Sequence, residues 1–198
     1  YINKARTPQG KFKRACCLAA VGNVSPMGAP IGRKALVFPE ALAIMDGKGP
    51  LPVVVGDVYA TTLKSRRVFY ATDNAGEIGF DALLVALLEM GKHVTVAVKE
   101  PAYFEDATRV EAIFFNLNRT ADKVVTVNKV FIPGKGKSSA DQAFRQSDLV
   151  ISKGTGNYEA LRGETQGKPA IYLLKIKCDP IARDMGISEG RFVVKLDK

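Results

Sequence analysis

The chain has 198 residues, of which 46% are hydrophobic and 25% are charged. This balance is typical of one ordinary globular domain, and no stretch reaches the roughly 18 uninterrupted apolar residues that a membrane-spanning helix requires. The net charge of +9 favours anionic partners such as phosphate esters or nucleic acids. Because the basic residues are scattered, without the interleaved aromatics of a single-strand binder, nucleic acid is the less favoured of the two.

The chain contains three cysteines, Cys16, Cys17 and Cys178. An odd number with two adjacent members matches neither a disulfide framework nor the spacing of a zinc site. We therefore expect small apolar side chains that are buried or partly buried. A reducing, cytoplasmic location fits this pattern best, and no secretory signal is seen.

Residues 1–50 differ in character from the rest and predict a helical flank, with helices over 12–21 and 40–45. From residue 51 to 198, β-branched runs alternate with helical patterns, which predicts an α/β domain with a mostly parallel sheet covered on both faces. Strands are expected near 53–55, 68–72, 94–98, 124–127, 149–152, 170–174 and 192–194.

Four further helices are predicted between these strands. The clearest spans 78–90, ends at Gly91 and carries one apolar stripe, formed by Phe80, Leu83, Leu84, Leu87 and Leu88. The next spans 106–117, with Asp106 as its N-cap or in its first turn. Shorter helices are expected over 139–145 and 158–161. The single histidine, His93, is interpreted as a surface or helix-terminal residue.

Polar side chains follow two of the predicted strands. Asp73 and Asn74 come directly after the strand at 68–72, and Asp106 follows the strand at 94–98. Open α/β folds bind ligands at the carboxyl ends of their strands, and carboxylate and amide oxygens suit Mg²⁺ or Mn²⁺. Two ligands from one turn are insufficient, so Asp106 is the expected third. The alternative is that all three residues merely cap the helices that follow.

A third polar turn follows the strand at 149–152. Lys153 precedes Gly154 and Gly156, and Asn157 opens a helix. Glycines let backbone amides approach an anion, and the lysine adds a positive charge, so this turn is a candidate phosphate cradle. It matches neither the Walker pattern nor the dinucleotide fingerprint, and an ordinary turn with a surface lysine is the alternative.

Four ordered blocks of this sequence resemble one family. They are Asp-Asn-Ala-Gly-Glu-Ile-Gly-Phe-Asp at 73–81, the strand at 94–99 with Glu-Asp-Ala-Thr at 105–108, Asp-Leu-Val-Ile-Ser-Lys-Gly-Thr-Gly-Asn-Tyr-Glu at 148–159, and Tyr-Leu-Leu-Lys-Ile-Lys-Cys at 172–178. The chain resembles the metal-dependent damage-control phosphatases, a family also described as acidic-residue methyltransferase-like. The blocks cover most of the chain from Gly22 onward.

The resemblance implies an α/β/α sandwich that hydrolyses phosphate monoesters of small metabolites, such as sugar phosphates, with Mg²⁺, Mn²⁺, Co²⁺ or Ni²⁺. It places the metal at Asp73, Asn74 and Asp106, and the catalytic functions at Asp73 and Lys153. The expected substrate-binding residues are Asn23, Glu77, Gly154, Gly156 and Asn157; Asn23 could instead simply satisfy its turn. Pro26 stands where the family usually has an aspartate, and the flank at 1–50 is shorter than the family's helical region.

Two other functions stay open. Some relatives have been proposed to methylate protein carboxylates with S-adenosylmethionine, although neither glycine turn here offers the usual adenosine-binding pattern. The net charge leaves a non-catalytic nucleic-acid binder as the third possibility. Within the phosphatase hypothesis, Asp73 could be a nucleophile instead of a metal ligand.

Overall fold

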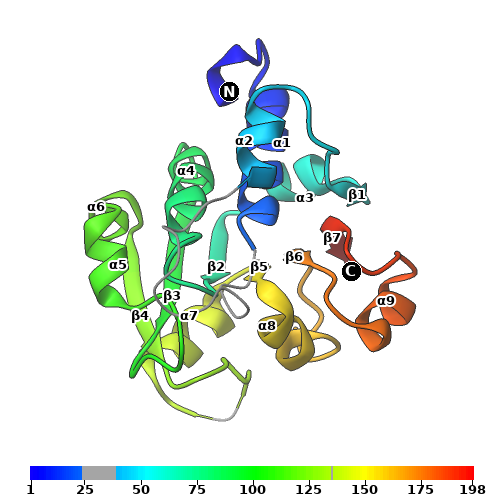
Figure 1. The fold of residues 1–198 in the computed structure, drawn as a ribbon. Coiled ribbons are helices and arrows are strands. Elements are labelled where there is room, and N and C mark those ends of the chain that lie inside the picture. Colours follow the sequence, from blue (N-terminus) through cyan, green and yellow to red (C-terminus); the bar gives the residue numbers. More distant parts are fainter. Residues whose placement is uncertain (24–38, 135) are drawn as a thin grey trace.

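A computed structural model describes residues 1–23, 39–134 and 136–198 (Figure 1). In this part of the chain, seven strands form one sheet of order β1-β7-β6-β5-β2-β3-β4. The strands are β1 (Val53–Val55), β2 (Arg67–Ala71), β3 (His93–Lys99), β4 (Lys123–Val127), β5 (Leu149–Lys153), β6 (Ala170–Lys175) and β7 (Phe192–Asp197). Every neighbouring pair is parallel except β6 and β7. The seven predicted strands and the mostly parallel sheet are confirmed.

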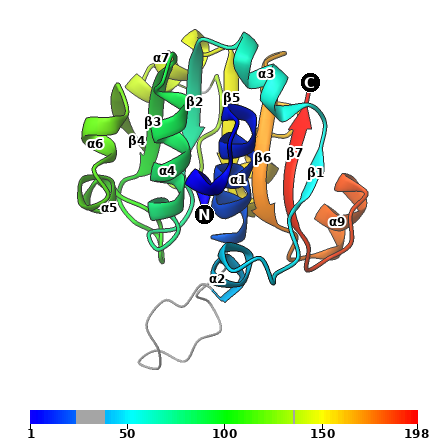
Figure 2. The ribbon, with the colours of Figure 1, turned by 90° about the horizontal axis from the view of Figure 1, so that it is seen from above.

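Helices cover both faces of this sheet. They are η1 (Ile2–Lys4), α1 (Pro8–Val21), α2 (Pro39–Met45), α3 (Val58–Lys64), α4 (Ile78–Leu88), α5 (Arg109–Phe114), α6 (Leu117–Thr120), α7 (Ser139–Gln146), α8 (Gly154–Leu161) and α9 (Asp179–Met185). Figure 2 shows α1, α3 and α4 in front of the strands, and Figure 1 shows α7 and α8 on the opposite face of the sheet. The expected three-layer α/β/α sandwich is confirmed, and α1 of the amino-terminal flank packs against α4 and β6. None of the helices described is long and apolar enough to cross a membrane.

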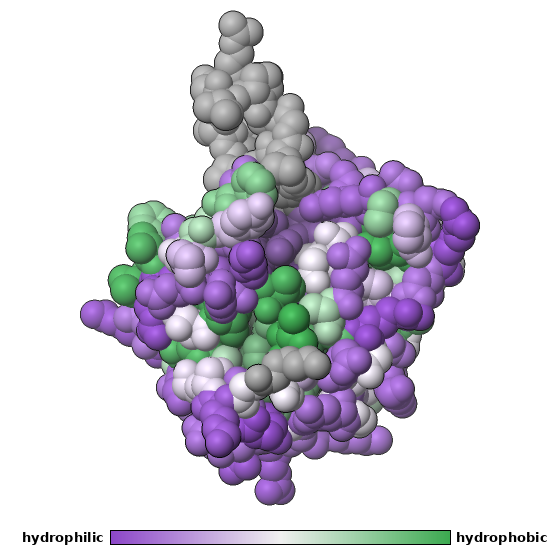
Figure 3. Space-filling model, turned by 90° about the horizontal axis from the view of Figure 1, so that it is seen from below, coloured by the Kyte–Doolittle hydropathy of each residue, from purple (hydrophilic) through white to green (hydrophobic). Residues whose placement is uncertain are grey.

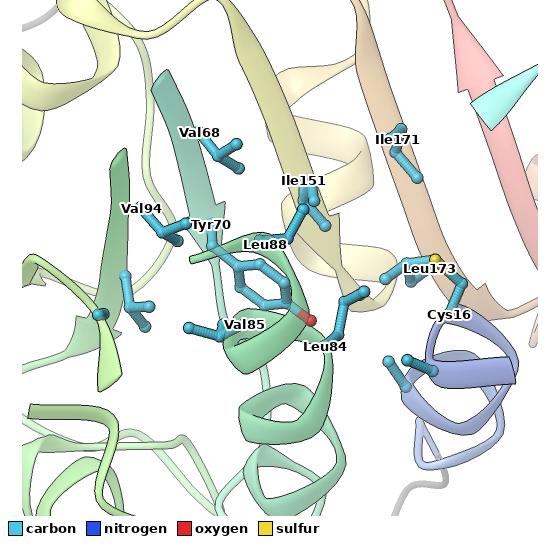
Figure 4. Packing of buried hydrophobic residues seen from close by; sticks show 14 of the residues in the cluster. Cys16, Val68, Tyr70, Leu84, Val85, Leu88, Val94, Ile151, Ile171 and Leu173 are labelled. Atoms are coloured by element: carbon cyan, nitrogen blue, oxygen red, sulfur yellow. The ribbon is translucent and has the colours of Figure 1, made fainter. Parts of the chain in front are cut away.

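The core consists of one apolar layer on each face of the sheet. On the face covered by α1 and α4, Tyr70 of β2 packs with Leu84, Val85 and Leu88 of α4, and Cys16 of α1 contributes to the same layer (Figure 4). Cys16 and Cys17 are buried and Cys178 is half-buried, as expected. The opposite layer lies under α7 and α8. Figure 3 shows the surface of that side, where hydrophilic side chains surround an apolar area.

The prediction for the buried face of α4 was partly wrong. Leu83 is 45% exposed, whereas Asp81 is completely buried on the inward face together with Leu84 and Leu88. Helical periodicity permits both choices, because residue 81 lies one turn from 78 and from 84 or 85. The buried cation described below compensates the charge of Asp81.

The predicted helix at 106–117 forms as two shorter helices. Thr108, not Asp106, caps α5, and its capping box with Glu111 is complete. Asn116 adopts the left-handed conformation, with φ of 59°, and separates α5 from α6. The expectation that Asp106 caps this helix was therefore wrong, which leaves its carboxylate for another purpose.

Three further differences concern short elements. Helix α8 begins at Gly154, four residues before the predicted start, so the glycine turn is itself the first helical turn. Helices α3 and α9 were not predicted. Both are single short helices of 7 residues, too brief to show a clear apolar period.

Candidate active site

The backbone brings two acidic turns together at the carboxyl ends of β2 and β3. Residues 73–75 pair with residues 105–107 through an isolated antiparallel bridge between Asn74 and Asp106. Main-chain hydrogen bonds of 2.7 and 2.9 Å flank this bridge on either side. In such a non-hydrogen-bonded pair the two Cα atoms are about 4.5 Å apart and both side chains project to the same side. Asn74 and Asp106 can therefore reach one common ligand.

Asp73 joins the same group from the first position of the turn. Its Oδ2 accepts hydrogen bonds from the side-chain amides of Asn74 (3.0 Å) and Asn23 (2.9 Å). A Cβ atom on Gly154 would lie 1.9 Å from this Oδ2, so the Asp73 carboxylate occupies the space of a side chain at the start of α8. Gly154 also has a φ of +78°, a conformation that other residues rarely adopt.

The side-chain oxygens of this group suit a hard cation. Neither Asp73 nor Asn74 caps α4, whose N-cap residue Glu77 makes no side-chain cap bond. Asp106 Oδ2 accepts the Tyr103 N–H (3.0 Å). In the residues that the structure describes, Asp73 Oδ1 and Asn74 Oδ1 accept no hydrogen bond. Two carboxylates and one amide oxygen fit the oxygen-ligand preference of Mg²⁺ or Mn²⁺.

No group of three or more His, Cys, Asp or Glu side chains in the described residues is placed to hold a metal. A cation would therefore depend on the amide oxygen of Asn74 together with Asp73 and Asp106. The remaining coordination positions would belong to water or substrate, as is usual for Mg²⁺.

A buried ionic cluster lies beneath the two turns. The Lys153 ammonium donates to Asp81 Oδ1 (2.7 Å) and Glu77 Oε1 (3.1 Å), and the Tyr70 hydroxyl donates to the same Asp81 oxygen (2.8 Å). Lys153 is the last residue of β5, and Glu77 and Asp81 lie one turn apart at the start of α4. All four side chains are almost completely buried.

Burial sets the charge states in this cluster. Loss of solvent raises the pKa of Glu77 to about 7, although Lys153 opposes the shift; Asp73 and Asp81 add to it. Burial likewise raises the pKa of Asp81, against the effect of Lys153. Burial lowers the pKa of Lys153, but Asp81 and Glu77 more than offset this and hold it above its usual range. The lysine is therefore cationic at every physiological pH.

Asn23 connects the cluster to the turn at Asp73. Its side-chain amide donates to Glu77 as well as to Asp73, and its Oδ1 accepts the main-chain N–H of Lys175 at the end of β6 (3.1 Å). The side chain is completely buried. Asn23 thus holds the end of α1 against the sheet and fixes the orientation of the Asp73 carboxylate.

The predicted site residues fall into two levels. Asp73, Asn74 and Asp106 are partly exposed, and Gly156 is exposed at the start of α8. The buried level contains Asn23, Glu77, Lys153, Gly154 and Asn157. Asn157 donates to the main-chain carbonyls of Thr72 and Lys153, both at 2.8 Å. The roles of all these residues stay predictions, and Pro26 lies outside the described residues.

Sequence reasoning missed three polar residues near the site, Tyr70, Asp81 and Lys99. Lys99 ends β3, and its ammonium lies 3.7 Å from Asp106 Oδ1. The burial of Asp81 had one signal in the sequence. Asp81 is an acid within an apolar helical stripe, four residues after Glu77, and this spacing indicates that the two acids form a buried pair. His93 is an exposed surface residue beside Asp122 (3.3 Å), as predicted.

The fold and the site together define an α/β protein with an oxygen-rich group of side chains at the carboxyl edge of a mostly parallel sheet, which is the usual ligand position in such folds. Comparison with known proteins specifies the family. A family model described as the damage-control phosphatase ARMT1-like domain matches residues 1–193, and the chain belongs to this family.

Several archaeal proteins are similar to the chain. A damage-control phosphatase of Archaeoglobus fulgidus is 36% identical over 190 residues, which are 93% of this chain and 65% of that protein. A damage-control phosphatase of Pyrococcus horikoshii is 28% identical over 94% of this chain and 66% of its own length. The crystal structure of a DUF89 family protein from P. horikoshii superimposes with a TM-score of 0.78 at 26% identity, covering 94% of this chain and 66% of that one. The chain thus spans slightly less than two thirds of the relatives it matches.

Proposed function

We propose that this protein is a divalent-metal-dependent phosphatase that hydrolyses phosphate monoesters of small metabolites, such as sugar phosphates. The observation that carries the proposal is the convergence of Asp73, Asn74 and Asp106 on one backbone bridge at the ligand-binding edge of the sheet. The names of the archaeal relatives support the same reaction class.

Asp73, Asn74 and Asp106 would hold the cation, with Mg²⁺ or Mn²⁺ favoured by their oxygen ligands and Co²⁺ or Ni²⁺ as further candidates. When bound, such a cation supplies Lewis-acid polarisation of a phosphoryl oxygen. Asp73 would bind the cation through Oδ1, because its Oδ2 already accepts hydrogen bonds from Asn23 and Asn74. A nucleophilic role for Asp73 would use the same oxygen, so the two roles compete.

The start of α8 is the second component of the proposed site. The helix has 8 residues; its first residue, Gly154, lies against the Asp73 carboxylate, and the exposed Gly156 follows in the same turn. Free N–H groups in a first helical turn attract phosphate oxygens. Direct contact between Lys153 and the phosphate would use the one ammonium hydrogen that Glu77 and Asp81 leave free. If Lys153 does not contact the phosphate, it acts from the buried cluster by orienting the carboxylates of Glu77 and Asp81.

The test is hydrolysis of an aryl phosphate and of a sugar-phosphate panel with Mg²⁺, Mn²⁺, Co²⁺ or Ni²⁺. We expect Asp73→Asn to reduce the rate by at least about a thousandfold, because it removes a charge at the reacting centre. Its melting temperature should stay close to that of the wild type.

Asp57→Asn provides the matched control, since Asp57 caps α3 through the Ala60 N–H and asparagine caps equally well. Full activity of the Asp73→Asn variant, or a wild-type chain that hydrolyses no ester with any of the four metals, would refute the proposal.

A further inference from the structure

Lys99 is tied by the backbone to the same turns as the proposed metal ligands. Its N–H donates to the carbonyl of Ala107 (2.8 Å), and the N–H of Ala107 donates to the carbonyl of Asp73 (2.9 Å). The segment 105–107 therefore lies between the ends of β2 and β3 and contacts both. A shift of the Lys99 backbone relative to Asp73 would break these main-chain hydrogen bonds, so the backbone of Lys99 is held beside the two acidic turns.

The side chain of Lys99 is buried without a full set of hydrogen bonds. It is 5% exposed, and the nearest acidic oxygen, Asp106 Oδ1, is 3.7 Å from the ammonium, beyond hydrogen-bond distance. Within the described parts of the chain, the Lys99 ammonium donates no hydrogen bond. Lys99 Nζ is not among the fully buried side-chain atoms that lack a hydrogen-bond partner in the described residues, so the ammonium at the end of this buried side chain is accessible to a ligand. The Lys153 ammonium, by contrast, donates to two carboxylates.

The negative charges of Asp73, Asp106 and a bound phosphate ester favour a further cation beside the two acidic turns. Asp73 and Asp106 together carry two negative charges, which one divalent ion would neutralise. A phosphate monoester brings up to two more, and like charges at this separation repel. Among the described residues, Lys99 is the one cation paired with Asp106, and its buried side chain reaches the partly exposed Asp106 carboxylate. A charge-assisted hydrogen bond from its ammonium to a phosphoryl oxygen would satisfy the donor and balance the ester.

We propose that Lys99 binds the phosphoryl group of the substrate. This inference rests on the proposed phosphatase function and specifies which residue recognises the anionic end of the ester.

The experiment compares Lys99→Met, Lys99→Arg and Lys123→Met. Lys123 is an exposed lysine at the start of the neighbouring strand, at the opposite edge of the sheet, and serves as the control. Calorimetry with inorganic phosphate, with and without Mg²⁺, gives Kd. Steady-state hydrolysis gives KM. The Mg²⁺ concentration for half-maximal rate shows whether metal binding through Asp106 is changed. Lys99→Gln replaces the methionine variant if the latter does not fold.

We expect Lys99→Met to raise both the phosphate Kd and KM by about ten- to a hundredfold, the loss of one charged hydrogen bond. Lys99→Arg should recover part of this affinity, and Lys123→Met should have no effect. The Mg²⁺ requirement should change little in all three variants.

An unchanged phosphate Kd with a raised Mg²⁺ requirement would show that Lys99 only positions Asp106, and would overturn the proposal. The same holds if the wild-type chain binds no phosphate. Lys99-dependent phosphate binding without hydrolysis of any ester would instead refute the phosphatase function and leave the anion site standing.

Discussion

Acidic residues occur at two levels of this molecule, and their surroundings differ. At the carboxyl edge, the backbone bridge between Asn74 and Asp106 sets the positions of the side chains, and within the described residues Asp73 Oδ1 and Asn74 Oδ1 accept no hydrogen bond. Beneath the edge, the carboxylates of Glu77 and Asp81 accept hydrogen bonds from the Lys153 ammonium, and Asp81 also accepts one from the Tyr70 hydroxyl. The first arrangement suits the binding of an external ligand. In the second, the charged groups are paired with one another, with Asp81 Oδ2 left without a hydrogen bond in the described residues, and the cluster supports the first.

One residue couples the two levels. Asn23 donates to Asp73 of the upper level and to Glu77 of the lower level. The orientation of the Asp73 carboxylate therefore depends on the buried cluster. If the two levels differ as described, substitutions in the lower level should act mainly on stability, and substitutions in the upper level mainly on activity.

The largest difference is expected between Lys153→Met and Asp106→Asn. Removing the ammonium leaves Glu77 and Asp81 buried without a cation, which should lower the free energy of unfolding by about 3–5 kcal/mol. Asp106 is 16% exposed, and its replacement should cost less than about 1 kcal/mol. Urea unfolding at pH 8 measures both values.

The Lys153→Met/Asp81→Asn double variant is the control for this pair, because neutralising Asp81 should restore part of the lost stability. Equal stability losses for Lys153→Met and Asp106→Asn would contradict the division into two levels.

A second pair of variants tests the contact between Asp73 and α8. Gly154→Ala places a methyl group where the Asp73 carboxylate lies and adds strain at a positive φ, so we expect hydrolysis to fall by at least about a hundredfold and stability to fall by about 1–2 kcal/mol. Gly156→Ala meets no neighbouring atom and should keep or slightly raise stability.

Any effect of Gly156→Ala should be confined to KM, if phosphate approaches the first turn of α8. Kinetics and thermal unfolding of the two variants separate these outcomes. Comparable activity of Gly154→Ala and the wild type would show that Asp73 does not need its place against α8.

A smaller effect is expected on the pH dependence of stability. Burial raises the pKa of Glu77 from the ordinary value of 4.5 to about 7 in the folded chain. Between these values the folded state binds the extra proton, so the stabilising contribution is complete below pH 4.5 and is lost as the pH rises through 7. Compared with Glu77→Gln, the wild type should therefore lose on the order of 2 kcal/mol between pH 5 and pH 8.

Urea unfolding in the presence of a chelator measures this trend without competition from metal. Glu189→Gln, at an exposed position, should show no such trend relative to the wild type. A stability difference between wild type and Glu77→Gln that is flat with pH would show that Glu77 stays ionised in the folded chain.

The repeating pattern of the sequence was sufficient to predict the sheet. All seven strands follow from runs of β-branched and apolar residues, and their separation by helix-length segments predicts parallel pairing. The order of turns along the chain was also sufficient to predict that Asp73, Asn74 and Asp106 lie close together, because the carboxyl ends of adjacent parallel strands meet at one edge.

Other features could not be read from local patterns. The buried side of α4 includes Asp81 and excludes Leu83, since a cation from β5 reaches this helix. Similarly, Thr108 rather than Asp106 caps α5, because the backbone bridge to Asn74 holds Asp106 away from the helix. Both outcomes depend on contacts with distant parts of the chain.

The sequence by itself determined the α/β class, the strand positions and the identity of the acidic turns, because hydrophobic periodicity and turn chemistry are local properties. Only the tertiary structure decided which polar residues are partly exposed at the carboxyl edge of the sheet and which are buried in contact with one another. Asp73, Glu77 and Lys153 each have a partner fifty or more residues away along the chain, and burial, not residue type, determines whether a charge is free to bind a ligand.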